Sequence, residues 1–215
     1  MTMKGQENQL KAIEAAVQKA ELKTSGEIVP VISDKCSNTT FVFPLIFLSC
    51  LSLAIVLQQI YFPFNHWDHN IFWQVSLPVL FLFLLSLGLS KIYWVQRFFI
   101  PKRYLEKEVQ EQAELEFYRW VNSKTKDKTG ILLFVSLMER YSVVLADTSI
   151  SQKLPPETWT EVLQILNSQM SQSDLARGFV PAIEKCRELL SQHFPRDPND
   201  TDELPNYPIL RRDDS

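Results

Sequence analysis

The chain has 215 residues and a formal net charge of −3 at pH 7, with acidic and basic residues nearly balanced. A nucleic-acid-binding protein needs a strongly basic face, so we expect no nucleic-acid partner. The three cysteines, Cys36, Cys50 and Cys186, are too few and too widely spaced for a disulfide framework or a CxxC metal site.

The first segment, residues 1–40, predicts a helix followed by a strand. Apolar residues recur at near-helical spacing from Gln9 to Leu22, and Gly26 supplies a helix stop. The following residues, Glu27–Ser33, are rich in β-branched side chains and predict a strand, in which Pro30 favours an edge position or a bulge. We assign this segment to the first part of an α/β domain.

Residues 41–95 contain two long apolar runs, at about 41–62 and 71–95. Between Lys35 and Lys91 the only charged residue is Asp68, in the polar break between the runs. A bilayer core needs roughly 20 mostly apolar residues per helix, and each run supplies about that many. A buried helix of a soluble domain would show a polar face, which neither run has. The pattern predicts a transmembrane helical hairpin, with a very apolar core hairpin as the alternative.

The basic residues predict an orientation for this hairpin. The loop 63–70 contains neither Lys nor Arg, whereas Lys35 precedes the hairpin and Lys91 and Arg97 lie at its end. The positive-inside rule then places both flanks in the cytoplasm and the loop outside. We therefore expect a multi-pass membrane protein, with the lipid bilayer as a partner and a cytoplasmic folded domain.

Residues 96–195 predict the second part of that domain. The expected elements are a helix over Arg103–Asn122, a strand over Ile131–Leu137, a return strand over Tyr141–Ala146, a loop over Ser151–Pro156, a helix to about Met170 and a helix from about Ser173 to His193. The remaining residues, 196–215, are rich in Pro and Asp and are expected to form a disordered tail.

This order of elements predicts an α/β fold with a small mixed sheet flanked by helices and interrupted by the two-helix hairpin. The first two strands are connected through a helix, so we expect them to be parallel. The third strand follows the second after a tight turn, so we expect it to return antiparallel.

The predicted topology brings carboxylates together at the two ends of the sheet. Glu27 begins the first strand and Asp147 follows the third, so both lie at one end among Ser and Thr hydroxyls. Such oxygen ligands suit Ca²⁺ or Mg²⁺. Asp34 and Glu139 lie at the opposite end and form a second pair of candidate metal ligands. The alternative is that these residues are ordinary turn, cap and ion-pair residues.

The sequence contains none of the common catalytic or nucleotide-binding motifs, such as GxGxxG, GxxxxGK[ST], HExxH and GxSxG. It therefore names no catalytic residue and no organic cofactor.

Several segments together resemble the TPM domain family, which is named after a thylakoid lumen protein, a photosystem II repair factor and a nematode modulator of acetylcholine receptors. The segments are AIEAAVQKAELKTSGEIVPVIS, GILLFVSLMERYSVVLADTSI and ARGFVPAIEKCRELLSQHFP, followed by DELPN. The chain is most similar to the bacterial membrane branch, in which a transmembrane hairpin interrupts the domain. This resemblance implies a multi-pass protein of the bacterial inner (plasma) membrane, with the loop 63–70 outside. Ser149 stands where many members have a glycine.

The resemblance implies an α/β sandwich and two kinds of function. Some members act as assembly or repair factors for membrane complexes, plant members have been described as acid phosphatases, and some members bind divalent cations. Matched to the family's motifs, Glu27 and Asp147 are the first candidate positions for a cation, with Asp34 and Glu139 behind them.

The function expected from the sequence is therefore that of a membrane-anchored accessory factor. It would bind other membrane proteins and assist their assembly, repair or quality control, with or without a bound divalent cation. The alternative is a metal-dependent phosphatase acting on phosphate esters, in which Glu27 and Asp147 hold the cation.

Overall fold

The computed structural model describes residues 3–38, 41–61, 71–90, 92, 95, 100–122, 125, 128–169, 174–196 and 203–211. The chain divides into two compact units. Unit 1 combines Met1–Cys36 with Leu105–Ser215, and unit 2 comprises Ser37–Tyr104.

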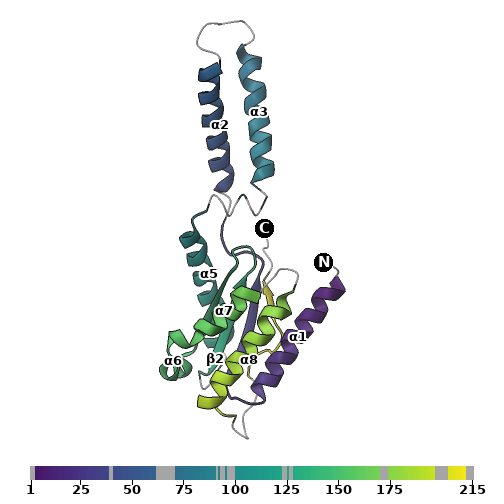
Figure 1. Ribbon diagram of the computed structural model, residues 1–215, viewed down its shortest axis with the longest axis vertical. Helices are drawn as coiled ribbons and strands as arrows, with labels where there is room; N and C mark the ends of the chain where they lie inside the picture. The colour runs from purple at the N-terminus through teal and green to yellow at the C-terminus, as the bar shows by residue number, and fades with distance from the viewer. Residues whose placement is uncertain are drawn as a thin grey trace. The chain divides into compact units, whose positions relative to one another are not determined.

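Unit 1 is built on a four-stranded mixed sheet (Figure 1) with the strand order β3–β2–β1–β4. The strands are β1 (Glu27–Ser33), β2 (Gly130–Ser136), β3 (Tyr141–Ala146) and β4 (Ile209–Arg211). β1 pairs in parallel with β2 along its whole length, and β3 returns antiparallel to β2. Both pairings agree with the topology expected from the sequence.

β1 and β2 are central strands, and every residue in them is buried. The uninterrupted apolar run of β2 suits a strand whose two faces are both covered. Pro30 had suggested an edge position or a bulge in β1. Instead β1 is paired on both sides, but β4 accompanies only Val31–Ser33, so Pro30 lies before the β4 pairing begins.

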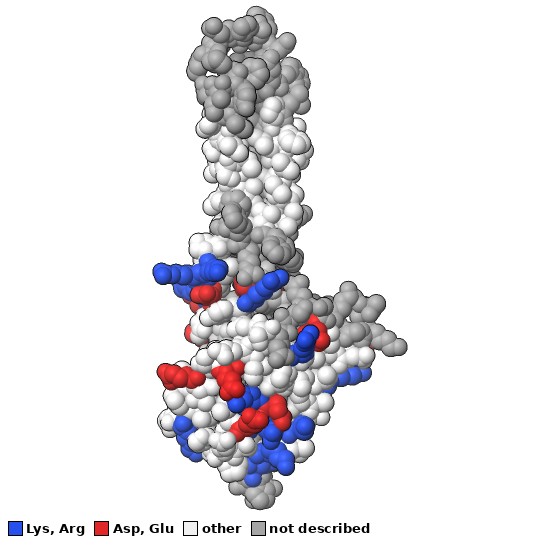
Figure 2. Space-filling model, viewed as in Figure 1, with Lys and Arg blue, Asp and Glu red and all other residues white. Residues whose placement is uncertain are grey.

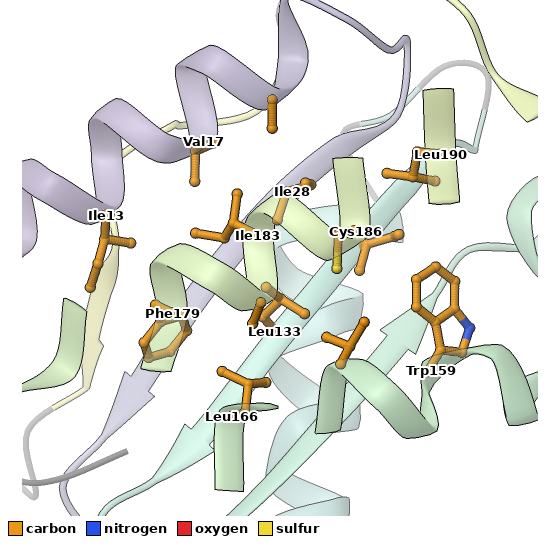
Figure 3. Close-up of a cluster of buried hydrophobic side chains, with 14 of the residues drawn as sticks. Ile13, Val17, Ile28, Leu133, Trp159, Leu166, Phe179, Ile183, Cys186 and Leu190 are labelled. Atoms are coloured by element: carbon orange, nitrogen blue, oxygen red, sulfur yellow. The ribbon is translucent and has the colours of Figure 1, made fainter. Parts of the chain in front are cut away.

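One face of the sheet is covered by α1 (Met3–Glu21), α7 (Thr160–Gln169) and α8 (Leu175–His193). Figure 3 shows the core between them, where side chains of α1 and α8 meet Ile28 of β1 and Leu133 of β2. Apolar side chains from these helices and from the strands make up this cluster, so the amphipathic stripes of the helices are buried against the sheet and one another.

The opposite face is covered by α5 (Lys102–Phe117) and by η1 (Tyr118–Asn122), a π-helical turn that continues α5. Val109, Ala113 and Val121 of this continuous helix pack on side chains of β1, β2 and β3. The sheet therefore lies between two helical layers, as in a three-layer sandwich.

The connection from β3 to α8 differs from the expected one. A loop was expected over Ser151–Pro156, but a short helix α6 (Thr148–Lys153) occupies most of it, and η2 (Pro156–Trp159) leads into α7. α8 begins after Asp174, which caps it; Ser173, the residue near which the helix was expected to begin, lies outside the described residues.

The tail 196–215 was expected to be disordered, yet part of it completes the sheet. β4 pairs in parallel with the outer edge of β1, and Leu204 is 6% exposed in the core below α5. The composition, rich in Pro and Asp, had suggested disorder. A strand of three residues is too short to show a hydrophobic pattern in the sequence, and β4 is ordered because it pairs with β1.

Unit 2 contains two apolar helices, α2 (Val42–Tyr61) and α3 (Ile71–Leu89). The Phe83 ring of α3 lies edge-to-face against Phe43 and Phe47 of α2, with centroid distances of 5.5 and 5.6 Å. Edge-to-face aromatic contacts of this kind stabilise the pair beyond their buried area. The helices form a hairpin, whose predicted loop 63–70 lies outside the described residues.

The prediction of membrane-spanning helices is corrected by the structure. Across the parts of the chain that the structure describes, no helix combines the length and the apolar character needed to cross a bilayer. The two spans expected at about 41–62 and 71–95 had rested on the count of uncharged residues in the sequence.

The fold class and the location are corrected together with the spans. The structure supports a mixed α/β fold with a four-stranded sheet flanked by helices, and it does not support the transmembrane hairpin. The assignment to the bacterial inner membrane as a multi-pass protein rested on these spans, as did the orientation with the loop outside.

Candidate functional site

The sheet register places Glu27 and Asp147 at the same end of the sheet, on either side of Gly130. Glu27 is the register partner of Gly130, and the backbone N–H of Asp147 donates to the Gly130 carbonyl at 2.9 Å. Because neighbouring strands lie about 4.8 Å apart, the Cα atoms of the two acidic residues are separated by roughly 10 Å. The two carboxylates could bind one ion only if the space over Gly130, which lies between the two residues in the sheet, were open.

That space is filled by the helical layer. A Cβ atom at Gly130 would lie 2.2 Å from Val121 Cγ1 and 3.3 Å from Thr125 Cγ2. Val121 and Thr125 are themselves buried. The absence of a side chain at Gly130 thus lets η1 pack close to the sheet at this position.

Asp147 is 2% exposed and caps α6. Its Oδ1 accepts from the backbone N–H of Thr148 at 2.6 Å, and its Oδ2 accepts from the Thr125 hydroxyl at 3.2 Å. A short polar side chain at this position satisfies N–H groups that the first turn of a helix leaves without helical partners. The geometry therefore assigns Asp147 a capping role.

Glu27 is 8% exposed, and its Oε1 accepts from the backbone N–H of Glu203 at 2.5 Å. Its own backbone N–H donates to the Thr129 carbonyl at 3.1 Å. The carboxylate therefore anchors the C-terminal segment to the start of β1.

The hydroxyls expected around these carboxylates also form structural hydrogen bonds. Thr24 is 1% exposed, donates to the Phe194 carbonyl at 2.6 Å and accepts from the Gly26 N–H at 3.0 Å. The Thr129 hydroxyl donates to the Ser25 carbonyl at 3.1 Å. These bonds hold the turn before β1 against the end of α8.

At the other end of the sheet, Asp34 and Glu139 have different environments. Asp34 is exposed, and its backbone N–H and C=O bond to Arg211 and Met138. Glu139 is 4% exposed; its Oε1 accepts from the Cys36 N–H at 3.2 Å, and its Oε2 accepts from the Ser136 hydroxyl. Glu139 thus ties the turn after β2 to the residues after β1.

The Cys36 thiol lies in this same cluster. Burial raises the pKa of the Cys36 thiol, hydrogen bonds to the Ser136 and Ser33 hydroxyls lower it in part, and the negative charge of Glu139 raises it further. A raised pKa keeps the group as a thiol, which is a poor nucleophile and a poor metal ligand.

The four acidic residues expected as metal ligands are therefore found in two separate places, and no set of three is formed. Among the described residues, no group of three or more His, Cys, Asp or Glu side chains is arranged to hold a metal ion. The divalent-cation site stays a prediction from the sequence. No observation of the donor geometry adds support to it.

The sequence analysis missed a buried ionic cluster around Glu116. Glu116 belongs to a run of glutamates on its helix, a pattern that ordinarily indicates a solvated face, yet it is 2% exposed. It accepts hydrogen bonds from Arg119 at 3.0 Å, from Trp120 Nε1 at 2.9 Å and from Arg211 of β4 at 2.5 Å. The i+3 and i+4 spacing of Arg119 and Trp120 was visible in the sequence, but the contact with Arg211 depends on the unexpected strand.

Comparisons with known proteins give one structural likeness. No family model matches the chain, and no curated protein matches it. The structure is similar to the NMR structure of the BA42 protein from the psychrophilic bacterium Bizionia argentinensis, with a TM-score of 0.57 and 21% sequence identity. The match covers 94% of this chain and 92% of that one. At this identity the likeness shows a shared fold, and the TPM resemblance remains an expectation from the sequence.

Proposed function

We propose that the protein is an accessory factor that binds other proteins through the helical hairpin α2–α3. The observation that carries this proposal is the dense apolar surface of the hairpin. The large apolar side chains that are at least one-third exposed on the two helices are Leu45, Leu48, Leu53, Ile55, Val56, Leu80, Phe81, Phe83, Leu84, Leu85 and Leu87.

This surface also lacks charge. The sequences of α2 and α3 contain no Lys, Arg, Asp or Glu, and Figure 2 shows their described part as an uncharged column, whereas the surface of unit 1 carries many charges of both signs. Contiguous exposed apolar patches of more than a few hundred Å² are uncommon on monomeric proteins and typically mark interaction sites.

The chemistry of the surface indicates the class of partner. Aliphatic and aromatic side chains on paired helices pack well against other apolar helices, whose surfaces offer complementary ridges and grooves. Subunits of membrane complexes expose such helices before they assemble. We therefore propose that this chain assists the assembly, repair or quality control of proteins of that kind.

Nothing in the described geometry favours the phosphatase alternative over this role. Asp147 serves as a helix cap and Glu27 as an anchor for the C-terminal segment. The partners described for these carboxylates are backbone N–H groups and a hydroxyl, whereas phosphoryl transfer also requires cationic groups on the phosphate.

The test is co-purification of full-length tagged protein from its native cells, with charge introduced on one unit at a time. Leu53→Glu and Leu84→Glu place a charge on the hairpin, where Leu53 is 60% and Leu84 58% exposed. Leu22→Glu and Leu115→Glu are matched controls in unit 1, with exposures of 65% and 61%. We expect the same partner with wild type and both controls, and its loss with both hairpin variants. A partner retained by the hairpin variants would refute the proposed surface.

A further inference from the structure

The outer edge of β1, on the side away from β2, is closed by three different means along its length. In a strand, the backbone groups of alternate residues point to opposite sides in the plane of the sheet. Glu27 points toward β2, since its N–H donates to the Thr129 carbonyl at 3.1 Å. Ile28 therefore points outward, and its N–H donates to Glu21 Oε1 at 3.1 Å. Pro30 has no N–H, and β4 covers the edge beyond it.

The cover over this last part of the edge belongs to one short segment, residues 203–211, which we call the strap. The strap ends in β4, where the Arg211 carbonyl accepts from the Asp34 N–H at 3.1 Å. At the other end of the strap, the Glu203 N–H donates to Glu27 Oε1 at 2.5 Å. Backbone groups at both ends of the strap are therefore bound to β1 or to the residue that follows it.

A buried ion pair joins the strap to the helical layer. Arg211 donates to Glu116 Oε1 at 2.5 Å, and Glu116 is 2% exposed. The same carboxylate also accepts from Arg119 and Trp120 of its own continuous helix, at 3.0 and 2.9 Å. If Arg211 withdraws, Glu116 therefore keeps a cation and a second donor. The withdrawal breaks one charged hydrogen bond but does not leave an isolated buried charge.

Most of the strap is half-buried or exposed. Leu204 and Pro208 are buried, whereas Tyr207 and Leu210 are 54% and 36% exposed and the other strap residues are half-buried. β1 is paired with β2 along its whole length without any contribution from the strap. Segments with little buried apolar surface at the periphery of a sheet open locally at a lower free energy than the whole fold. The strap has these properties, and the sheet does not depend on it for the pairing of its two central strands.

We propose that the strap guards the outer edge of β1, opening and closing as one unit while the sheet stays folded, and that the Glu116–Arg211 ion pair sets how often it opens. A closed strap keeps the backbone groups of Val31–Ser33 from pairing with other extended chains, which is the hazard of an uncovered sheet edge. The strap lies in unit 1 and the proposed partner surface in unit 2, so this inference does not rest on the proposed function.

Amide hydrogen exchange of the full chain, measured by NMR at single residues, tests the opening. The N–H groups of Asp34 and Glu203 report on the strap, because their hydrogen bonds join it to the sheet. The Leu137 N–H donates to the Ser33 carbonyl at 3.0 Å and reports on the pairing of the two central strands. The Met138 N–H donates to the Asp34 carbonyl at 3.1 Å and reports on fraying at the end of β1.

In the wild type, the opening equilibrium measured at Asp34 should equal that at Glu203, because the strap opens as one unit. Both should be at least about tenfold larger than the opening equilibria at Leu137 and Met138, because local opening costs less free energy than global unfolding. Exchange at Asp34 and Glu203 that is as slow as at Leu137 would refute local opening. Unequal openings at Asp34 and Glu203, or equal ones at Asp34 and Met138, would refute a strap that opens as one unit.

Arg211→Ala tests the ion pair. It should raise the opening equilibrium of the strap by at least about tenfold, because the closed state loses a charged hydrogen bond. Glu116→Gln should act in the same direction, and the double variant should show less than the product of the two factors, because both substitutions remove one interaction. Arg177→Ala, at an exposed position of α8, is the matched control and should leave the opening unchanged. An opening that Arg211→Ala leaves unchanged, or that Arg177→Ala raises equally, would refute control by this ion pair.

The guarding role is tested by light scattering of the full-length protein under native conditions. Arg211→Ala should aggregate at least about threefold faster than Asp147→Ala, because only the first variant uncovers a sheet edge. Asp147→Ala removes a helix cap at the opposite end of the sheet and leaves the strap in place, so it controls for a general loss of stability. An aggregation rate that is no higher for Arg211→Ala than for Asp147→Ala would overturn the guarding role.

Discussion

Asp147 and Gly130 are neighbours at one end of the sheet. Hydrogen bonding determines the residue type at the first position, and the space available determines it at the second. Asp147 supplies acceptors for the N-terminus of α6 and for the buried Thr125 hydroxyl. Gly130 supplies space, because η1 lies too close to the sheet for any side chain. Stability effects at these positions follow from the contacts that each residue makes.

Asp147→Ala is expected to lower the free energy of unfolding by about 1–2 kcal/mol, because it removes a helix cap. Urea denaturation with and without added Ca²⁺ measures this. The control Asp34→Ala, at an exposed position, should stay within about 0.5 kcal/mol of wild type. A stability loss at Asp147 seen only when Ca²⁺ is present would contradict the capping role and favour a metal ligand.

Gly130→Ala is expected to destabilise the fold by about 1–3 kcal/mol, because the new methyl group overpacks the core. The additional substitution Val121→Ala should recover part of this loss, since Val121 Cγ1 is the atom 2.2 Å from the new Cβ position. Gly26→Ala provides a comparison: its nearest atoms are flexible Leu190 methyl groups, the closest at 2.9 Å, so its cost should be smaller. Equal costs at both glycines would contradict the account of close packing.

Cys186 lies in the core beside Ile183 (Figure 3), and burial raises its pKa from 9.0 to about 12. Between these pH values the folded chain holds a proton that the unfolded chain has released, so stability falls as pH rises. The slope is at most about 1.4 kcal/mol per pH unit. Denaturation at pH 8 and pH 10 should show a smaller drop for Cys186→Ala than for wild type; an equal drop would contradict this origin.

At the scale of elements, the strands with strong local patterns were predictable and the weakly patterned one was not. β1 and β3 have the predicted bounds, and β2 is shifted by one residue. β4 has only three residues, and its place depends on the edge of β1 and on Glu116, far away in sequence. The burial of Glu116 was not predictable either, because its partner Arg211 lies on β4, a strand that has no pattern in the sequence.

The importance of β4 can be measured by two truncations. Removing residues 212–215 should leave the free energy of unfolding unchanged, because β4 is intact. Removing 209–215 should lower it by about 2–3 kcal/mol or more, since Glu116 then loses a charged partner in a buried place. Thermal unfolding of both variants measures the difference, and equal stability would show that β4 contributes nothing to the sheet.

At the scale of the whole molecule, unit 1 contains two buried apolar clusters, whereas many of the described apolar side chains of unit 2 are exposed. The sequence indicated where the apolar segment lies, because its lack of charge is a property of composition. It also predicted that this segment spans a membrane, and the helices that the structure describes do not support that prediction. Glu27 and Asp147 lie at one end of the sheet, as the predicted topology required, but the packing of Val121 over Gly130 could not be predicted from the sequence.

The most direct test of the proposed function is site-specific photo-crosslinking in living cells. A photoreactive amino acid is placed at Leu53, at Leu84 or, as a control in unit 1, at Tyr118, which is 68% exposed. We predict that the two hairpin positions crosslink to the same small set of proteins and that Tyr118 does not. An absence of protein products from both hairpin positions, or the same products from Tyr118, would contradict the proposal that α2–α3 is the partner-binding surface.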